Sequence, residues 1–401
     1  MYILLATDFP PQIGGIQTYH SSLARALQQI GREVHVIATE HPGAEEYDVQ
    51  CPFPITRVSI AGGKPRIYRR MRDAAVRIGR QGAGCSADTA GSAGGPSNSR
   101  LLRGIISTKW SPEGLGAKQA AERLDVPWGG FGHDREHVLL GGNPLKWVLQ
   151  QYLFDHANFC FAISNYAADN FRRRGVKEDS LRMVGCGMDS DSFHPDPERA
   201  AALRERHNLQ SKRVLLTISR LVPRKGHITV IEALPRLREA VGEACYLIVG
   251  EGEYLGPLHR AVAARNLQEH VIFAGKAPAE ELCGYYTLGD VMVMPSYDIP
   301  GAPTEGFGLT FLEANCCGTP VIGSRTGGIP DAVDHGLSGL LVPPRDPAAL
   351  ARAAVRLLTE PGLAKRMGEY GQRRAREMFG WDLVARRVDA AFAEVVGEEP
   401  R

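Results

Sequence analysis

Acidic and basic side chains gather in two short segments in the second half of the chain. Residues 219–226 read Ser-Arg-Leu-Val-Pro-Arg-Lys-Gly, with Arg220 and Lys225 directly after a strand-like run. Two fixed cations and the start of a helix can stabilise the charge that grows on a departing diphosphate. Loop cations are more often plain surface charges, so the argument depends on their position at a strand end. We therefore expect Arg220 and Lys225 to be catalytic residues that act on a phosphorylated leaving group.

The second segment, residues 304–314, runs from a loop into a predicted helix and carries two glutamates. Glu305 precedes the helix and could accept hydrogen bonds from sugar hydroxyls. Glu313 lies more than a turn further on, where its carboxylate could take both hydroxyls of a ribose. The alternative is that Glu305 only complements the helix dipole and Glu313 is a surface charge. Glu313 interrupts an apolar run, which favours the binding role.

Gly14 and Gly15 come where the first predicted strand ends and its helix begins. Ligands bind at the carboxyl ends of parallel strands, and paired glycines let backbone N–H groups approach a phosphate or a hydroxyl. A simple tight turn explains the pair equally well. We keep Gly14 and Gly15 as candidate contacts to an acceptor.

Short apolar runs alternate with helix-length amphipathic segments, and this pattern occurs twice. It is typical of parallel sheets covered on both faces, so we predict an α/β fold of two Rossmann-like domains facing across a cleft. The Asp-, Ser-, Gly- and Pro-rich segment 187–197 is the predicted linker. We place the domains at 1–187 and 188–380, with a last helix in 381–401 that crosses back to the first domain. The predicted strands are residues 2–7, 33–38, 158–163, 180–184, 214–218, 246–249, 271–273, 291–294 and 320–322.

The composition narrows the class of protein. The 401 residues exceed what one core usually fills, and 43 % apolar with 23 % charged residues is the balance of an ordinary globular protein. A formal charge of +2 gives no reason to expect a nucleic acid partner. Eight scattered cysteines without a Cys-x-x-Cys pair predict no metal site and a reducing, cytoplasmic location. We expect no cofactor, no export signal and no membrane-spanning helix, so that any membrane contact is peripheral at the inner face.

Several segments together resemble the family 4 retaining glycosyltransferases of the two-Rossmann GT-B fold. The likeness is strongest over residues 214–345 and also includes the amino-terminal half at Gly14, Gly15 and residues 144–167. The segments that carry it in the second half are 220–226, 249–252, 273–275, 294–296, 305–313 and 318–330.

This resemblance implies that the carboxyl-terminal domain binds a nucleoside diphosphate sugar, a GDP- or UDP-sugar, and that the amino-terminal domain binds a glycan or lipid-linked acceptor. Arg220 and Lys225 would bind the diphosphate, while Glu305 and Glu313 would bind the donor sugar and the ribose. Transfer would retain the anomeric configuration and use no metal ion. The other donor contacts that it implies are Gly250, Gly275, Lys276, Leu282, Gly306, Phe307, Gly308 and Leu309.

One position departs from the family's pattern. Related enzymes usually carry His-Gly-x-Glu or His-Gly-x-Asp, whose first histidine touches the donor sugar, where this chain reads Phe131-Gly132-His133-Asp134. Residues two apart on a strand share one face, so His133 could replace the missing imidazole only through a shift in depth. A structural role is as compatible with a lone loop histidine. We keep His133 as a candidate catalytic residue, with weakened or altered activity as the open consequence.

Residues 64–80 hold seven basic side chains and one acid. Ile67, Met71, Ala74 and Ile78 fall on one helical face, so the segment could lie on an anionic bilayer or hold a phosphorylated lipid acceptor. The stripe is narrow, which favours a solvated basic helix packed on its own domain. The glycine-rich, polar stretch 82–99 is a predicted loop.

We therefore predict a retaining, metal-independent glycosyltransferase that moves a hexose (mannose, glucose or N-acetylglucosamine) to a glycan or lipid-linked acceptor, in envelope polysaccharide or glycolipid synthesis. Two rivals stay open. One is a non-catalytic nucleotide-sugar-binding protein, which Phe131 makes conceivable. The other is a nucleotide-sugar epimerase or a phosphorylase of the same fold. A dehydrogenase is disfavoured because the Gly14-Gly15 turn lacks Gly-x-Gly-x-x-Gly.

Overall fold

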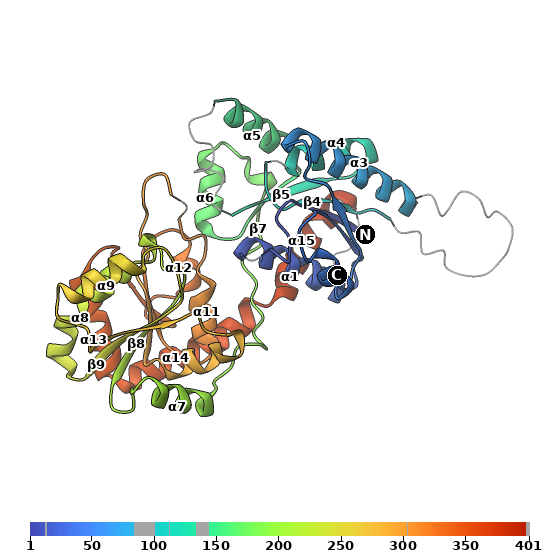
Figure 1. Cartoon of the computed structure of the whole chain (residues 1–401). Helices are drawn as coiled ribbons and strands as arrows, with labels where there is room; N and C mark the ends of the chain where they lie inside the picture. The colour runs from blue at the N-terminus through green and yellow to red at the C-terminus, as the bar shows by residue number, and fades with distance from the viewer. Residues whose placement is uncertain (13, 84–100, 112, 134–143, 303, 398–401) are drawn as a thin grey trace. The chain divides into compact units, whose positions relative to one another are not determined.

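The computed structural model describes residues 1–12, 14–83, 101–111, 113–133, 144–302 and 304–397. The chain divides into two compact units, the first made of Met1–Gly187 with Trp381–Arg401 and the second of Met188–Gly380 (Figure 1). Each unit is a parallel sheet with helices around it, which confirms the predicted fold class. Residues 84–99 of the predicted loop lie outside the described residues.

The described part of the first unit contains a seven-stranded sheet in the order β3-β2-β1-β4-β5-β6-β7, and all neighbouring strands are parallel. β1, β4, β5 and β6 are buried along their whole length, as a sheet covered on both faces requires. The strand order reverses between β1 and β4, so the carboxyl ends of these two strands mark the expected ligand position. The strands are β1 (Tyr2–Ala6), β2 (Val34–Thr39), β3 (Ile55–Val58), β4 (Gly104–Ser107), β5 (Trp128–Gly132), β6 (Phe159–Ala162) and β7 (Leu181–Met183).

A buried ion pair fixes the last helix, α15, in the first unit. Asp389 of α15 accepts hydrogen bonds from Nε and Nη2 of Arg32, each at 2.8 Å, and from the Tyr2 hydroxyl at 2.7 Å. Phe392, one turn on, packs edge-to-face on the Tyr2 ring at 5.1 Å. A buried carboxylate is tolerated only with partners of this kind, so the contact specifies where α15 docks. The helices of this unit are α1 (Gly15–Gln29), α2 (Ala44–Val49), α3 (Lys64–Ala83), α4 (Glu113–Leu124), α5 (Pro144–His156), α6 (Asn165–Arg173) and α15 (Trp381–Val396).

The basic helix α3 packs on its own unit. Met71, Ala74 and Ile78 are buried, and α3 contacts α4, so the apolar stripe predicted from the sequence faces protein. The apolar stripe is therefore covered, as the plainer of the two interpretations of residues 64–80 expected, while several arginines of α3 stay exposed. In the described chain, no helix combines the length and the apolar character that crossing a bilayer demands.

The described second unit repeats the plan with a six-stranded parallel sheet in the order β10-β9-β8-β11-β12-β13, which reverses between β8 and β11. Its core is formed by β-branched and leucine side chains from the strands and from α8 and α13. The strands are β8 (Arg213–Ile218), β9 (Ala244–Val249), β10 (Val271–Gly275), β11 (Val291–Met294), β12 (Val321–Ser324) and β13 (Gly339–Val342). The helices are α7 (Pro197–Arg206), α8 (His227–Val241), α9 (Leu255–Ala263), α10 (Leu282–Leu288), α11 (Leu309–Cys316), α12 (Ile329–Ala332), α13 (Pro347–Thr359) and α14 (Pro361–Met378).

Candidate active site

Glu305 and two cations meet at the reversal point of the second sheet. Lys225 Nζ lies 2.6 Å from Glu305 Oε2, and Arg224 Nη1 lies 2.8 Å from the same oxygen. Burial alone would raise the pKa of Glu305, but the charges of Lys225 and Arg224 outweigh it and lower the pKa to about 2. Burial lowers the pKa of Lys225, and Glu305 opposes that shift. Glu305 is therefore an ionised carboxylate near neutral pH, suited to accepting hydrogen bonds and poorly suited to taking a proton.

Two glycines after β12 hold the backbone that carries Glu305. A Cβ on Gly328 would lie 1.9 Å from Gly306 O, and one on Gly327, whose φ is 53°, would lie 2.3 Å from Glu305 O. The Gly328 N–H donates to Glu305 O at 2.8 Å. Only glycine allows an approach this close, so the Gly327-Gly328 pair sets the position of Glu305.

Glu313 is half-buried on α11 rather than a surface charge. The Tyr286 hydroxyl of α10 donates to its Oε2 at 2.5 Å. Burial raises the pKa of Glu313, and the Tyr286 hydrogen bond opposes that shift. Gly308, with φ of 96°, precedes Leu309, where α11 begins, and the Phe307 side chain is buried against Phe379 with ring centroids 5.7 Å apart. Phe307 can therefore offer a ligand little beyond its backbone.

Four of the residues predicted to bind the sugar donor line one cavity. Arg220, Gly250, Lys276 and Leu282 line a cavity of about 330 Å³ at the ends of β8, β9 and β10, and Gly275 immediately precedes Lys276. A Cβ on Gly250 would lie 1.9 Å from the Ser219 carbonyl oxygen, so the backbones after β8 and β9 touch here. The cavity has the size of a small ligand pocket.

Arg224 is a neighbour of Glu305 that the sequence did not lead us to expect. Arg220 is exposed at the cavity, while Arg224 makes the contact with Glu305. The signal was available, because Arg224 is the immediate neighbour of Lys225 in the short 3-10 turn Pro223–Lys225.

The predicted residues of the first unit lie at the carboxyl ends of its strands. Gly14 precedes α1 and Gly15 begins it, after the loop that follows β1, so the predicted helix start is where the pattern placed it. His133 follows β5 and is 9 % exposed, whereas Phe131 is fully buried. The two rings stack at 5.9 Å with an interplanar angle of 14°, so they share one face of the strand, as a period of two requires.

His133 has a partner that the sequence did not reveal. Its Nε2 lies 2.7 Å from Nε2 of His20 on α1, and His20 is completely buried. No local pattern marks this pair, since 113 residues separate its members.

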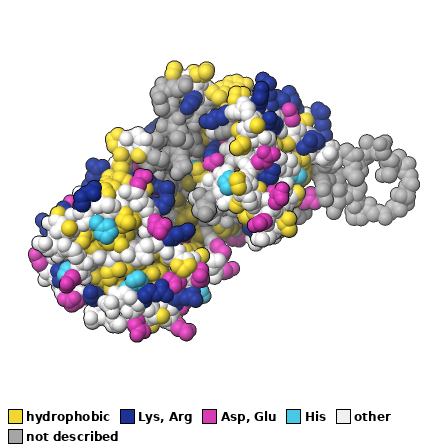
Figure 2. All heavy atoms as spheres, viewed as in Figure 1, with side chains coloured by type: hydrophobic (Ala, Val, Ile, Leu, Met, Phe, Trp, Pro, Cys, Tyr) yellow, Lys and Arg dark blue, Asp and Glu magenta, His cyan; other side chains and the backbone are white. Residues whose placement is uncertain are grey.

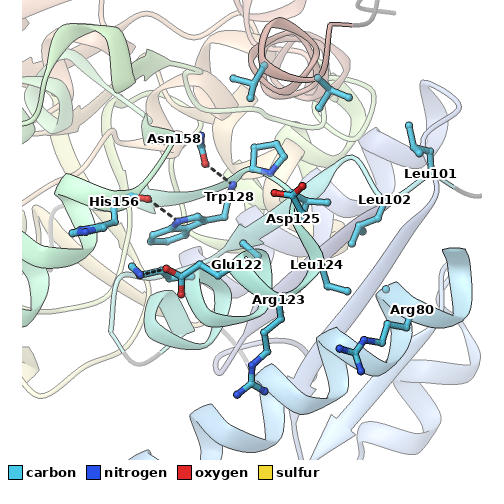
Figure 3. Close-up of a pocket in the computed structure, with 17 residues that line it drawn as sticks. Arg80, Leu101, Leu102, Glu122, Arg123, Leu124, Asp125, Trp128, His156 and Asn158 are labelled. Atoms are coloured by element: carbon cyan, nitrogen blue, oxygen red, sulfur yellow. Dashed lines mark hydrogen bonds and ion pairs between the residues drawn. The ribbon is translucent and has the colours of Figure 1, made fainter.

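A larger cavity in the first unit lies away from these residues. It measures about 850 Å³ and lies beside the amino ends of β5 and β6 and the end of α4 (Figure 3). Trp128 uses both of its N–H groups within the wall, on Asn158 Oδ1 and on the His156 carbonyl, each at 3.0 Å. Ligands of parallel α/β sheets bind at the opposite, carboxyl edge, so its volume does not make it the candidate site.

Comparison with known proteins identifies the family. A model described as "Glycosyl transferases group 1" matches residues 200–374, and one described as "Glycosyl transferase 4-like domain" matches residues 14–187. The GDP-mannose-dependent alpha-(1-6)-phosphatidylinositol monomannoside mannosyltransferase of Mycolicibacterium smegmatis is 32 % identical, covering 94 % of each chain. Its namesake from Mycobacterium tuberculosis is 31 % identical, covering 96 % of each.

A solved structure shares the fold. The crystal structure of Anabaena Alr3699/HepE in complex with UDP and glucose has a TM-score of 0.75 at 18 % identity, covering 99 % of both chains. Together with the relatives that match nearly the whole length, these comparisons show that the chain belongs to the group 1 glycosyltransferases, family 4 enzymes of the GT-B fold.

Proposed function

We propose that this glycosyltransferase moves mannose from GDP-mannose to a phosphatidylinositol mannoside, with retention of configuration and without a metal ion. The names of the two mycobacterial relatives supply the donor and the acceptor class. The observation that carries the chemistry is the contact of Lys225 and Arg224 with Glu305 at the reversal point of the second sheet.

The leaving group would be neutralised by fixed positive groups. Lys225 and Arg220 follow β8, and the first N–H groups of α11 begin at Leu309, after Gly308. Cations and a helix start around a diphosphate stabilise its developing charge as a divalent ion would. The nucleoside would then occupy the cavity between Gly250 and Leu282, with Glu313 on the ribose.

Glu305 would bind a sugar hydroxyl and leave the proton transfer to the substrates. A carboxylate with a pKa of about 2 is a weak base and a weak nucleophile. We therefore assign attack to the face of the leaving group. The bond from the anomeric carbon to the phosphate oxygen breaks, the bond to the acceptor oxygen forms on the same face, and the departing phosphate oxygen takes the acceptor's proton. The acceptor would approach Gly14, Gly15 and His133.

Product analysis tests this function. Purified protein is incubated with GDP-mannose and phosphatidylinositol monomannoside in the presence of EDTA, and the anomeric configuration of the new linkage is read by NMR. The expected product is α-linked, as in the donor, with turnover unchanged by EDTA. A β-linked product, or turnover that EDTA abolishes, would contradict the mechanism. Turnover with UDP-glucose in place of GDP-mannose would contradict the donor assignment.

The lipid-linked acceptor implies contact with a membrane surface, and we assign it to α5 and α3. Leu145 and Val148 of α5 are 75 % and 66 % exposed, and Trp147 and Tyr152 on the same helix are also exposed. Figure 2 shows hydrophobic side chains gathered over α5 and Lys and Arg side chains over α3. An apolar patch beside exposed arginines complements an anionic bilayer.

Sedimentation with vesicles tests the surface. The full chain should sediment with vesicles of phosphatidylcholine and phosphatidylglycerol and much less with phosphatidylcholine alone. The double variant L145S/V148S should lose this binding, whereas Val49→Ser, which removes an 86 % exposed valine elsewhere in the unit, should keep it. Equal sedimentation of L145S/V148S and the unaltered protein would refute the assignment.

A further inference from the structure

His20 and His133 form a closed pair at the carboxyl edge of the first sheet. Their Nε2 atoms lie 2.7 Å apart, and the rings are nearly perpendicular, at 88°, with centroids 4.9 Å apart. His20 comes from α1 and is 0 % exposed, whereas His133 follows β5 and reaches the surface with 9 % of its area. The buried member therefore has no exposed surface with which to contact a ligand itself.

Aromatic rings fix both imidazoles. Tyr19 packs edge-on against His20 and His133 with centroids 5.2 and 5.3 Å away, and Phe131 lies 4.9 Å from His20. The Tyr19 hydroxyl donates to the Gly185 carbonyl at 2.8 Å, which anchors this ring in turn. These contacts restrict where the His133 ring lies, and the Nε2 contact with His20 selects its rotation.

The surroundings keep His20 uncharged. Burial, the neighbouring His133 and the Lys109 ammonium all hold the pKa of His20 well below its ordinary range. Lys109 follows β4 and is itself paired with Asp8. A contact of 2.7 Å between two ring nitrogens requires one proton between them, so each imidazole fixes the hydrogen-bonding role of the other.

We infer that His20 is a positioning residue that holds the His133 imidazole in the orientation needed for the proposed sugar transfer. The inference rests on the proposed transfer reaction, and it takes His133 as the histidine that acts in place of Phe131. Phe131 has no polar atom, and His133 is the next residue along the strand on the same face. An imidazole at position 133 instead of 131 needs a different neighbour to fix its orientation. His20 of α1 is that neighbour.

Kinetics of three variants test the inference. His20→Phe keeps a buried aromatic ring and removes the hydrogen bond, so kcat should fall about 10²-fold because a misplaced group loses its approach geometry. KM for GDP-mannose should change much less. His20→Gln restores a polar nitrogen at the distance of Nε2 and should recover most of the rate. Gln29→Ala, at an exposed position of α1, should leave kcat unchanged, so an undiminished kcat in His20→Phe, or an equal loss in both variants, would overturn the proposal.

A double-mutant cycle separates positioning from general damage. In a His133→Asn background, His20→Phe should cause no further loss of kcat, and a second full loss would overturn the inference. NMR titration of the His133 imidazole gives a readout that needs no turnover. Its titration midpoint and ring-proton shifts should move in His20→Phe, and unchanged signals would overturn the pairing even if GDP-mannose proved to be the wrong donor.

Discussion

Each unit of the molecule contains an acidic side chain that is paired with two cations. The two clusters differ in how many of the carboxylate oxygens are hydrogen-bonded and in how far the carboxylate is buried. In the first unit, Asp389 is 0 % exposed, with both carboxylate oxygens held by Arg32 and with Arg103 Nε at 3.5 Å. In the second unit, Glu305 is 13 % exposed and receives both cations on Oε2.

Position in the sheet explains this difference. The Asp389 cluster involves Tyr2 and Arg103, which stand where β1 and β4 begin, while the Glu305 cluster lies where β8 and β11 end. A carboxylate whose oxygens are all hydrogen-bonded, at the amino ends of the strands, fixes the position of a helix. A carboxylate at the carboxyl ends that can still accept hydrogen bonds is able to bind a ligand. The same kind of charge cluster therefore stabilises the first unit, and we propose that it serves chemistry in the second.

The largest expected effect is the loss of stability in Asp389→Ala. Removing this carboxylate leaves Arg32 buried without its partner, so the unfolding free energy should fall by about 3–5 kcal/mol. Chemical denaturation followed by circular dichroism measures it. Asp382→Ala, at an exposed position of the same helix, is the control and should change little. A loss below about 1 kcal/mol would show that the saturated cluster is not structural.

Lys225→Ala should give the next largest effect, on rate rather than on stability. Loss of a fixed charge beside the leaving group should lower kcat about 10²- to 10³-fold while the KM for the acceptor changes little. Steady-state kinetics with GDP-mannose measures both. Lys365→Ala, at a 77 % exposed lysine of the same unit, should behave as the unaltered protein. Undiminished turnover in Lys225→Ala would remove the leaving-group role.

Arg224→Gln should have a smaller effect than Lys225→Ala. Glu305 keeps one of its two cations, so its pKa should rise and its orientation loosen, with kcat lower by about 10-fold. Arg224→Lys should recover part of the loss. If Arg224→Gln matched Lys225→Ala, the two cations would have to act as one unit on the diphosphate.

The smallest effect concerns the pH dependence of stability. The pKa of Glu305 is depressed to about 2, so its contribution is present above the unfolded value of 4.5 and is lost as pH falls from about 4.5 toward 2. Denaturation of the unaltered protein and of Glu305→Gln across this range gives the difference. That difference should shrink as the pH falls. A constant difference would mean that Glu305 is not held ionised by its neighbours.

In the described part of the chain, nine strands were predicted from their local apolar runs, and β3, β4, β5 and β13 were missed. The β-branched and apolar runs at 214–218 and 291–294 were found within a residue of β8 and β11. β5 was missed because three of its five residues are glycine. Those glycines make room for neighbours: a Cβ on Gly129 would lie 2.8 Å from the Phe161 ring, and one on Gly132 would lie 2.6 Å from the Phe171 ring.

The residues of the candidate site also fall into those with a local sequence signal and those without one. Lys225 and Glu305 come from segments with charge and glycine patterns, and the structure brings them into contact. His20 has no such local signal, because its contact with His133 is created by the packing of α1 beside β5. A single sequence shows which residues can do chemistry and seldom shows which residue holds them.

The return of the chain from the second unit to α15 sets an order of assembly during synthesis. Residues 188–380 leave the ribosome before Trp381 and Asp389, so the second unit can complete its sheet while the first still lacks its last helix. Until Asp389 arrives, the Arg32 guanidinium has no counter-charge from α15. The amino-terminal unit is therefore translated first and finished last, and a nascent chain stalled short of α15 presents an open flank to chaperones.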